Sequence, residues 1–193
     1  MSDLTADVVV PLLRGRFGTP YRYVASCPST QRLLGNEEAE GATVVTDHQT
    51  EGRGRFGRTW VDTPGRALLM SVLLRPEAPV EAWPELSPVA GSAVAEALRL
   101  STGVNATLRH PNDVVVEGRK LVGVLPEAQP YRVVLGIGVN VNQTTDELPS
   151  RALTPASSLR LELGHEVVRA PLLAAILLEL ERAYDAWIAL YRS

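Results

Sequence analysis

The segment from Asp47 to Trp60 concentrates residue types that can bind an anion. It reads Asp-His-Gln-Thr-Glu-Gly-Arg-Gly-Arg-Phe-Gly-Arg-Thr-Trp, so glycines are interspersed with arginines just before a tryptophan. Glycine allows a ligand to approach the backbone closely, and guanidinium groups match phosphate and carboxylate oxygens. Flexible segments that bind nucleic acid nonspecifically have a similar composition. Apolar runs at 42–46 and 67–74 flank the segment, which favours an anion-binding loop within a folded domain.

Residues 133–142 form a second pattern, a predicted strand with one nearly bare face. Alternation places small and amide side chains on one face (Gly136, Gly138, Asn140 and Asn142) and aliphatic side chains on the other (Ile137, Val139 and Val141). Because glycine packs nothing in a strand, a bare face indicates close approach of a ligand or backbone, or else a bulge or tight helix packing. We expect a flat ligand to lie on Gly136 and Gly138, with a carboxamide at its edge.

Lys120 is a charged residue inside an otherwise apolar strand. Alternation predicts that it shares a face with Val122 and Val124, beside Gly123. A lysine in this position either extends into solvent from an edge strand or points into a pocket. The pattern leaves both environments open.

Neutral polar side chains lie near these patterns. Thr30 and Gln31 begin a predicted helical turn, and Gln49 lies near the start of the arginine-rich segment. Their donors and acceptors suit an uncharged heterocycle that carries a urea or amide group. The segment 109–113, Arg-His-Pro-Asn-Asp, is typical of a simple turn when taken by itself.

Periodicity predicts the elements that must position these residues. Strands are predicted at 21–25, 43–46, 67–74 and 133–142, and a hairpin pairs 114–116 with 120–125 through a Glu117-Gly118 turn. A helix over 89–100 has Ser87 as its N-cap, Pro88 at its first position and Gly103 at its end. An amphipathic helix over 171–191 is predicted to bury Leu172, Leu173, Ile176, Leu177, Leu180, Tyr184, Trp187 and Leu190.

Composition limits the class of protein. The chain has 193 residues, of which 45% are apolar and 21% charged, with a formal net charge of −3. These values predict one domain over 1–193, soluble and cytoplasmic, and they argue against a dedicated nucleic-acid binder. Cys27 is the only cysteine, so no disulfide is expected. His48, His110 and His165 lack metal-ligand spacing, so no metal site built from protein clusters is expected.

Four segments, in order, resemble those of the biotin protein ligases. Ser29-Thr30-Gln31 is similar to their Ser-Thr-Asn segment, and 49–60 to their Gln-x-x-Gly-Arg-Gly-Arg-x-Gly-Arg-x-Trp loop. Pro111-Asn112-Asp113 with 118–125 is similar to their Pro-Asn-Asp and Arg-Lys-Leu-x-Gly-Ile-Leu segments, and 136–142 to their Gly-Ile-Gly-x-Asn-x-Asn strand. One such match is weak, whereas four in order are specific.

The resemblance implies a fold and an activity. The fold is α+β, with a mixed, largely antiparallel sheet and helices packed on one side, as in class II synthetases and biotin ligases. The activity is ATP-dependent formation of biotinyl-5′-AMP, followed by transfer of biotin to a lysine of a biotin carboxyl carrier protein domain. ATP, Mg2+ and biotin are the implied ligands. A homodimer fits the family, and neither DNA nor a membrane is an expected partner.

The resemblance also assigns roles to individual residues. It implies that Lys120 and Arg55 are catalytic, and that the loop over 52–58 becomes ordered over both ligands. The implied biotin contacts are Ser29, Thr30, Gln31, Gln49, Gly52, Arg53, Arg55, Lys120, Gly123, Gly136 and Gly138. The implied nucleotide contacts are Arg53, Arg55, Arg58, Trp60, Asn112, Lys120 and Asn140.

The chain also departs from the family pattern. Gln31 replaces the usual asparagine, and Arg109-His110 replaces the usual Lys-Trp. Pro126 stands in a run that usually continues with valine, so this strand is expected to stop early or to lie at a sheet edge. Neither an N-terminal DNA-binding domain nor the family's small C-terminal β-barrel is expected in this chain. The alternatives are a non-catalytic biotin- or adenylate-binding protein and a lipoate or octanoate ligase.

Overall fold

The computed structural model describes residues 2–150 and 154–192, which form a mixed sheet with helices. The strands are β1 (Tyr21–Val24), β2 (Thr43–Thr46), β3 (Ala67–Leu74), β4 (Thr107–Arg109), β5 (Asp113–Val116), β6 (Arg119–Gln129) and β7 (Arg132–Asn140). Their order across the sheet is β1-β2-β3-β7-β6-β5-β4. The β1–β2 pair is parallel, and the other neighbouring pairs are antiparallel.

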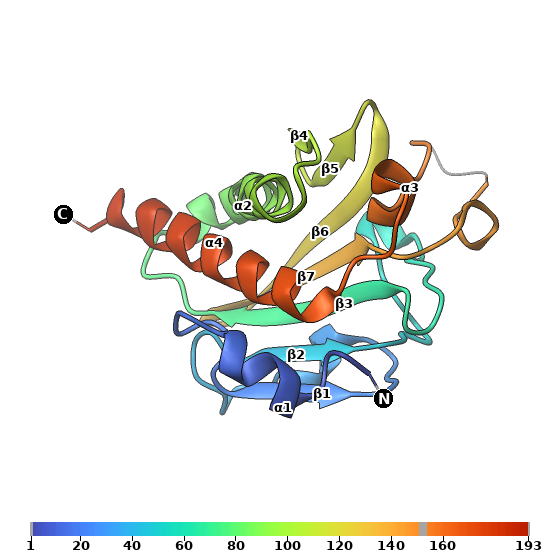
Figure 1. Ribbon diagram of the computed structural model, residues 1–193. Coiled ribbons are helices and arrows are strands. Elements are labelled where there is room, and N and C mark those ends of the chain that lie inside the picture. The colour runs from blue at the N-terminus through green and yellow to red at the C-terminus, as the bar shows by residue number, and fades with distance from the viewer. Residues whose placement is uncertain (1, 151–153, 193) are drawn as a thin grey trace.

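Helices cover one face of this sheet (Figure 1). They are α1 (Ala6–Val9), α2 (Leu86–Thr102), α3 (Leu159–Leu163) and α4 (Arg169–Ala189), and α2 packs against α4. The opposite face carries the 3-10 turn Thr30–Leu33 and part of the segment 47–60, which we call the arginine-rich loop. The predicted α+β class, with a largely antiparallel sheet and helices on one side, is confirmed. No helix in the described ranges has the length and apolarity to cross a bilayer.

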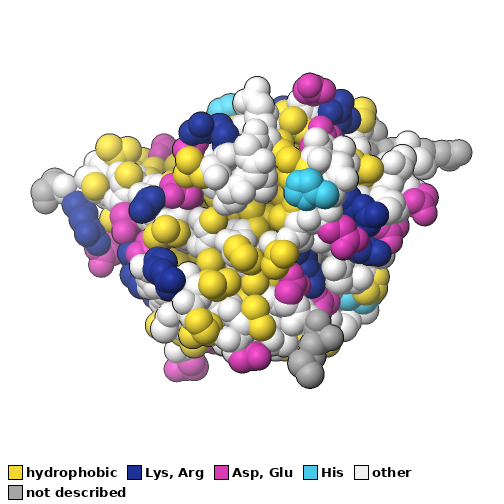
Figure 2. All heavy atoms as spheres, in the orientation of Figure 1, with side chains coloured by type: hydrophobic (Ala, Val, Ile, Leu, Met, Phe, Trp, Pro, Cys, Tyr) yellow, Lys and Arg dark blue, Asp and Glu magenta, His cyan; other side chains and the backbone are white. Residues whose placement is uncertain are grey.

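Charged side chains of both signs are intermingled on the face seen in Figure 2. This distribution agrees with the small formal net charge of −3. A nucleic-acid-binding face usually shows clustered lysines and arginines instead. The view in Figure 2 shows no continuous basic area of that kind on this face.

The main core lies between the sheet and the helices. β3 is buried along its whole length, because helices cover one of its faces and the 3-10 turn with its neighbours covers the other. α4 contributes the predicted stripe from Leu172 to Trp187. The prediction for Leu190 is wrong, since this residue is 77% exposed. The helix ends at Ala189, so the helical period no longer directs the next side chain into the core.

α2 begins earlier than the sequence predicts. Its first residue is Leu86 and its N-cap is Glu85, because the 3-10 helix Val80–Glu85 runs directly into it. Ser87, the predicted N-cap, lies inside the helix and donates a hydrogen bond to the Pro111 carbonyl at 3.1 Å. This contact connects α2 to the segment that leads into β5. The predicted end at Gly103 is confirmed.

A β-bulge in β6 decides where Lys120 points. In the pairing of β6 with β5, Leu121 is an extra residue without a partner. Leu121 and Val122 are therefore both buried in the helix-side core, together with Val124. The prediction that Lys120 shares a face with Val122 and Val124 is wrong, because the extra residue breaks the alternation. Lys120 lies on the other face, with its ammonium group near Gly123.

Pro126 does not end β6. The strand continues to Gln129 and remains paired with β7, so the first of the two expected outcomes, an early stop, does not occur. The predicted edge position is confirmed for this half of the strand, because β5 pairs with β6 only as far as Gly123. A proline lacks a backbone donor and is tolerated where a strand has no neighbour on one side.

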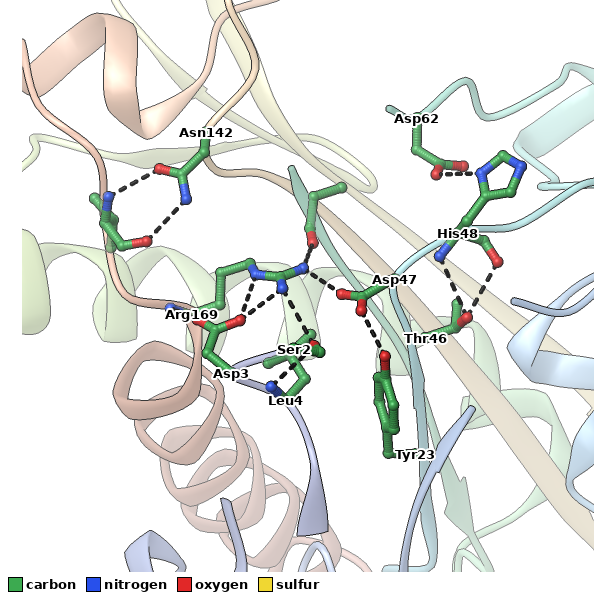
Figure 3. A network of polar contacts seen from close by, with 12 residues as sticks. Ser2, Asp3, Leu4, Tyr23, Thr46, Asp47, His48, Asp62, Asn142 and Arg169 are labelled. Carbon is green, nitrogen blue, oxygen red and sulfur yellow. Dashed lines mark hydrogen bonds and ion pairs between the residues drawn. The ribbon is translucent and has the colours of Figure 1, made fainter. Parts of the chain in front are cut away.

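A buried ion-pair network ties the start of the chain to α4 and to the arginine-rich loop (Figure 3). The Arg169 side chain is 6% exposed and contacts Asp3 at 2.6 Å and Asp47 at 2.7 Å. It also donates to the Ala67 carbonyl at 2.9 Å, and Tyr23 donates to Asp47 at 2.6 Å. Burial by itself raises the pKa of Asp47, but hydrogen bonds from Tyr23 and Arg169 lower it below its ordinary value.

We expect Arg169→Met to lower the free energy of unfolding by about 3–5 kcal/mol, because it leaves the Asp3 and Asp47 carboxylates without their buried cation. The pKa of Asp47 is lowered in the folded state, so its stabilisation is present above the pKa of an unfolded aspartate and is lost in acid. Urea unfolding at pH 7 and in acid measures both effects. Arg16→Met is the control: Arg16 pairs with Asp185 at 2.5 Å but is 44% exposed, so about 1 kcal/mol or less is expected. Equal losses in the two variants would contradict the assignment.

Candidate functional site

Two adjoining pockets lie on the sheet face opposite α2 and α4. The first has a volume of about 50 Å3 and is lined by Thr30, Gln31, Gln49, Arg53, Gly54, Arg55, Trp60, Met70, Asn112, Lys120, Gly123, Val124, Leu125, Gly136, Ile137 and Gly138. The second, of about 410 Å3, is lined by Gly54, Arg55, Phe56, Arg58, Thr59, Trp60, Val61, Asn112, Asp113, Lys120, Asn140, Pro149, Thr154 and Ala156. Five residues line both pockets and so lie where the two pockets meet: Gly54, Arg55, Trp60, Asn112 and Lys120. We call the first the glycine pocket and the second the cation pocket.

The floor of the glycine pocket is formed by glycines on β6 and β7. Gly123 faces Gly138 across these strands. A Cβ atom on Gly138 would lie 2.7 Å from the Trp60 ring, and one on Gly123 would lie 2.8 Å from it. A Cβ on Gly136 would lie 2.9 Å from the Gln31 carboxamide carbon. The expected close approach to this bare face is therefore present, and the flat groups on it are the protein's own indole ring and carboxamide.

The two glutamines of the glycine pocket are held in defined orientations. Gln49 Oε1 accepts from the Thr30 backbone at 2.9 Å, which leaves its amide nitrogen available to donate. Gln31 Nε2 donates to the carbonyls of Leu125 at 3.1 Å and Val134 at 3.3 Å, which leaves its carbonyl oxygen available to accept. The pocket can therefore offer one neutral donor and one neutral acceptor to a ligand.

A hydroxyl on β3 supports this arrangement. Ser71 is fully buried, and its Oγ lies 2.7 Å from the Thr30 hydroxyl. Sequence reasoning did not select Ser71, although a hydroxyl within the apolar run over 67–74 was a usable signal. The Ser71 hydroxyl holds the Thr30 side chain in place, and Thr30 in turn orients Gln49 through two hydrogen bonds.

Positively charged side chains meet at the boundary between the pockets. Lys120 Nζ lies 2.7 Å from Asp113 and 5.7 Å from the centre of the Trp60 ring. Arg55 donates to Asn112 Oδ1 at 2.9 Å. The amide nitrogen of Asn112 donates to a β6 carbonyl at 3.2 Å, so both amide atoms are engaged and Asn112 braces Arg55 against the sheet. Sequence reasoning assigned no role to Asp113, which belongs to one of the four motifs. The structure shows it to be the carboxylate partner of Lys120.

The arginine-rich loop folds back over the pockets, and backbone hydrogen bonds join its two arms. The Trp60 backbone donates to Gly52 at 3.0 Å, and Gly54 donates to Arg58 at 2.7 Å. A Cβ on Gly52 would lie 2.6 Å from the Trp60 carbonyl, so glycine is needed there for close backbone approach. Phe56 at the tip has a φ of 59° and is 81% exposed.

Side-chain contacts also hold the loop in place. Arg53 pairs with Glu127 on β6 at 2.9 Å. At the base of the loop, the Asp62 side chain is 1% exposed and lies 2.9 Å from His48. Together with the Asp47 network in Figure 3, these contacts fix the loop relative to β2 and β6.

Most residues predicted for the site line one of the pockets, and the exceptions are few. Ser29 and Gly52 line neither pocket, and Arg53 lines the glycine pocket but not the cation pocket. Asn142, which alternation placed on the glycine face, lies beyond the end of β7 and bonds the Val167 backbone instead. The strand ends at Asn140, so its alternation does not extend that far.

Cys27 has no feature of a nucleophile. Its side chain is buried, and burial raises the pKa of the thiol. A raised pKa lowers the thiolate fraction at neutral pH, and the thiolate is the reactive form. In the described ranges, no three His, Cys, Asp or Glu side chains are grouped so as to hold a metal ion.

Comparison with known proteins supports what the geometry suggests. The family model described as "Biotin/lipoate A/B protein ligase family" matches residues 23–143. The chain belongs to the biotin/lipoate A/B protein ligase family. The matched range contains the glycine floor, the arginine-rich loop and Lys120, so it carries nearly all of both pockets' linings.

Members of the biotin/lipoate A/B protein ligase family align with most of this chain. "Bifunctional ligase/repressor BirA" of Bacillus spizizenii is 37% identical over 167 residues, which are 83% of this chain and 51% of that protein. The "Biotin--[acetyl-CoA-carboxylase] ligase" of Mycobacterium tuberculosis is 38% identical over 165 residues, 81% of this chain and 59% of that protein. The chain thus spans little more than half the length of these relatives.

A solved structure in this family has the same fold. The structure described as "Biotin protein ligase from Aquifex aeolicus in complex with biotin and ATP" superimposes with a TM-score of 0.77 at 32% identity. The match covers 86% of this chain and 71% of that one. The architecture of strands and helices described above is therefore that of a biotin protein ligase catalytic domain.

Proposed function

We propose that this protein activates biotin with ATP to form biotinyl-5′-AMP and then transfers biotin to a lysine of a biotin carboxyl carrier protein domain. The observation that carries the proposal is the meeting of Lys120 and Arg55 at the boundary between two pockets. One pocket presents neutral hydrogen-bonding groups over a glycine floor. The other is larger and lined by cations. This pairing suits an uncharged ring with an acidic tail next to a nucleotide.

The first step joins two anions. A carboxylate oxygen of biotin attacks the α-phosphorus of ATP, the bond to the β-phosphate oxygen breaks, and pyrophosphate leaves. Repulsion between the carboxylate and the phosphates dominates the barrier, and the attacking and leaving oxygens must be roughly in line. Lys120 and Arg55 lie where these groups would meet, so they can neutralise charge that develops in the transition state.

The remaining residues of the predicted site divide between the two ligands. We assign Thr30, Gln31, Gln49, Gly123, Gly136 and Gly138 to biotin, and Arg58, Trp60, Asn112 and Asn140 to the nucleotide side or to the support of residues that face it. Arg53 and Gly52 shape the loop between them. Ser29 precedes the 3-10 turn, and its carbonyl accepts from the Arg32 backbone at 3.1 Å, so we assign it to the support of that turn.

The ring system that best suits the glycine pocket is one that contains a urea group. The oriented amide nitrogen of Gln49 can donate to a ureido oxygen, and the oriented carbonyl of Gln31 can accept from a ureido N–H. The dithiolane ring of lipoate has neither group and would leave the Gln49 amide nitrogen and the Gln31 carbonyl oxygen without partners inside the occupied pocket, which is costly. Biotin is therefore favoured over lipoate or octanoate as the substrate.

Binding requires the glycine pocket to enlarge. Its volume of about 50 Å3 is far below the range of about 300–1,000 Å3 that small-molecule pockets usually have. Trp60 and the arginine-rich loop occupy the space, so we propose that they move outward to admit biotin and then close again. A closed loop would protect the acyl phosphate from water until the acceptor arrives.

In the second step, the amine of the carrier lysine attacks the acyl carbon, and AMP leaves with the bonding electron pair and the amine loses a proton. No covalent intermediate with the enzyme is required, in agreement with the raised pKa of the Cys27 thiol. Because the reaction consumes ATP, we place it in the cytoplasm. Association into a homodimer stays a prediction that light scattering in solution would test.

The residues of the cation pocket fit a Mg2+ ion that binds together with the nucleotide. Asp113 is a carboxylate in the lining of the cation pocket, and Mg2+ is usually held by one or two carboxylates together with substrate phosphates. Bound in this way, Mg2+ would supply charge neutralisation on the phosphates. Lys120 also contacts Asp113, so the ammonium group and the metal ion would share this carboxylate.

Biotin-dependent exchange of labelled pyrophosphate into ATP tests the proposal. We expect exchange that requires biotin and is not supported by lipoate or octanoate. A carrier domain added with biotin and ATP should then acquire biotin, as detected by avidin blotting. Tight biotin binding without exchange would favour the alternative of a non-catalytic binding protein, and exchange with lipoate alone would overturn the choice of substrate.

A further inference from the structure

Gln143 lies outside the four motifs and lines neither pocket, yet it contacts one of the residues that do. Its side chain is almost fully buried, with 1% exposure, and Nε2 donates to Asn140 Oδ1 at 3.1 Å. Asn140, at the end of β7, is 5% exposed and lines the cation pocket. We propose that Gln143 is a positioning residue that fixes the Asn140 amide so that its NH2 group donates to the nucleotide. This inference rests on the proposed nucleotide site.

The direction of the hydrogen bond carries the argument. An asparagine amide can rotate by half a turn and present either its oxygen or its nitrogen to a ligand. In the structure Gln143 Nε2 is the donor, so the oxygen of Asn140 is turned toward Gln143. The nitrogen of Asn140 is then the atom left for the pocket. A donor suits phosphate or ribose oxygens, and it does not suit a metal ion.

Hydrogen bonds hold the backbone at Gln143, and they therefore fix the position from which its side chain extends. Its carbonyl accepts a hydrogen bond from the Ser158 hydroxyl at 2.7 Å. The Ser158 hydroxyl in turn accepts from the Leu161 backbone in the first turn of α3. The segment after β7 is therefore attached to α3. This attachment places Gln143 where its side chain can contact Asn140.

Stability alone would not favour a glutamine at position 143. Its Oε1 is buried and has no hydrogen-bond partner among residues 2–150 and 154–192. A buried polar atom without a partner costs free energy, whereas an apolar side chain of similar size would not. The donor on the same amide provides the compensating reason for an amide at this position.

Asn142 offers a matched comparison. It is two residues from Asn140, is also buried, and uses both of its amide atoms on the Val167 backbone, at 2.9 and 2.8 Å (Figure 3). It therefore attaches the chain to the start of α4 and makes no contact that bears on the cation pocket. Loss of Asn142 should affect stability without a selective effect on nucleotide.

The experiment compares KM values for ATP and for biotin in the exchange reaction. Gln143→Met preserves length and volume but removes the donor. We expect it to raise the KM for ATP by about tenfold while changing the KM for biotin by less than about twofold, as for loss of one hydrogen bond to a charged group. Asn142→Ala should lower the unfolding midpoint and leave the ratio of the two KM values unchanged.

A double-mutant cycle identifies the route of the effect. If Gln143 acts only through Asn140, then adding Gln143→Met to Asn140→Ala should cause no further rise in the KM for ATP. An additional rise, or an equal rise in both KM values, would overturn the proposal.

Two further measurements keep the inference separate from stability and from the proposed function. Asn140→Asp keeps an acceptor for Gln143 and puts a negatively charged carboxylate oxygen in place of the pocket-facing NH2. It should therefore raise the KM for ATP even more than Asn140→Ala, and no rise would refute the donor role. If the wild-type protein shows no exchange, the proposed function fails by itself. ATP titrated calorimetrically into wild type and Gln143→Met would then decide the inference, with equal affinities counting against it.

Discussion

Replacing Lys120 with alanine is expected to lower biotin-dependent pyrophosphate exchange by about 100- to 1,000-fold, the usual cost of removing one preorganised group that stabilises transition-state charge. The ammonium group lies at the boundary of the two pockets, 2.7 Å from Asp113 and above the glycine floor. The loss should appear mainly in kcat, because the charge that it neutralises is greatest as the carboxylate meets the α-phosphate. Steady-state exchange rates over a range of biotin and ATP concentrations would measure this split.

Arg119→Ala is the matched control for this prediction. Arg119 is the preceding residue on β6 and also a cation, but its guanidinium group pairs with Glu162 at 2.8 Å and with Glu117 at 3.0 Å, away from the pockets. Exchange by this variant should stay within about twofold of wild type. Stability should fall, because the Glu162 carboxylate is only 11% exposed and would lose its cation. A similar loss of exchange in both variants would show that positive charge on β6, and not the position of Lys120, is what matters.

Gly138→Val is expected to lower the affinity for biotin by about 100-fold or more, which corresponds to about 2.7 kcal/mol. A Cβ at this position would lie 2.7 Å from the Trp60 ring, and the branched methyl groups would occupy the floor itself. The indole ring would be displaced, and the pocket would be narrower in its open and closed forms. Calorimetric titration of biotin into the variant measures the loss directly.

Ile137→Val is the control for the glycine floor. Ile137 is the neighbouring residue on β7. Although it belongs to the lining of the glycine pocket, strand alternation directs its side chain away from the glycine floor into the helix-side core, where it is 3% exposed. We expect a loss of about 0.5–1.5 kcal/mol in stability and an unchanged affinity for biotin. Retention of wild-type affinity in Gly138→Val would show that biotin does not use this floor.

Local sequence determined most of the secondary structure and the face that carries the site. The run over 67–74 predicts β3 correctly because eight consecutive residues that are mostly apolar suit a strand buried on both faces. Glycines at 136 and 138 predict a close approach on one face, since no neighbouring residue can fill the space that they leave. The Glu117-Gly118 turn and the end of α2 at Gly103 were also fixed locally, because left-handed backbone is available mainly to glycine and a few other residues.

Where the alternation of a strand was interrupted, only the tertiary structure decided the outcome. The orientation of Lys120 depends on an extra residue in β6, and that bulge arises from how β6 registers against β5. Pro126 fits within a strand because β5 is too short to pair with it, which is a property of a distant segment. The partners of Asn142 and Gln143 depend likewise on where α3 and α4 dock.

The sequence by itself determined which chemical groups are present and which family pattern they follow: an arginine-rich loop, a lysine, paired amides and a glycine face. The tertiary structure decided their relations in space: Lys120 beside Asp113, Trp60 on the glycine floor, and Asn140 oriented by Gln143. The physical reason is that residue type and local period fix conformation within a few residues, whereas strand register, hydrogen-bond direction and side-chain partners depend on segments far apart in the chain.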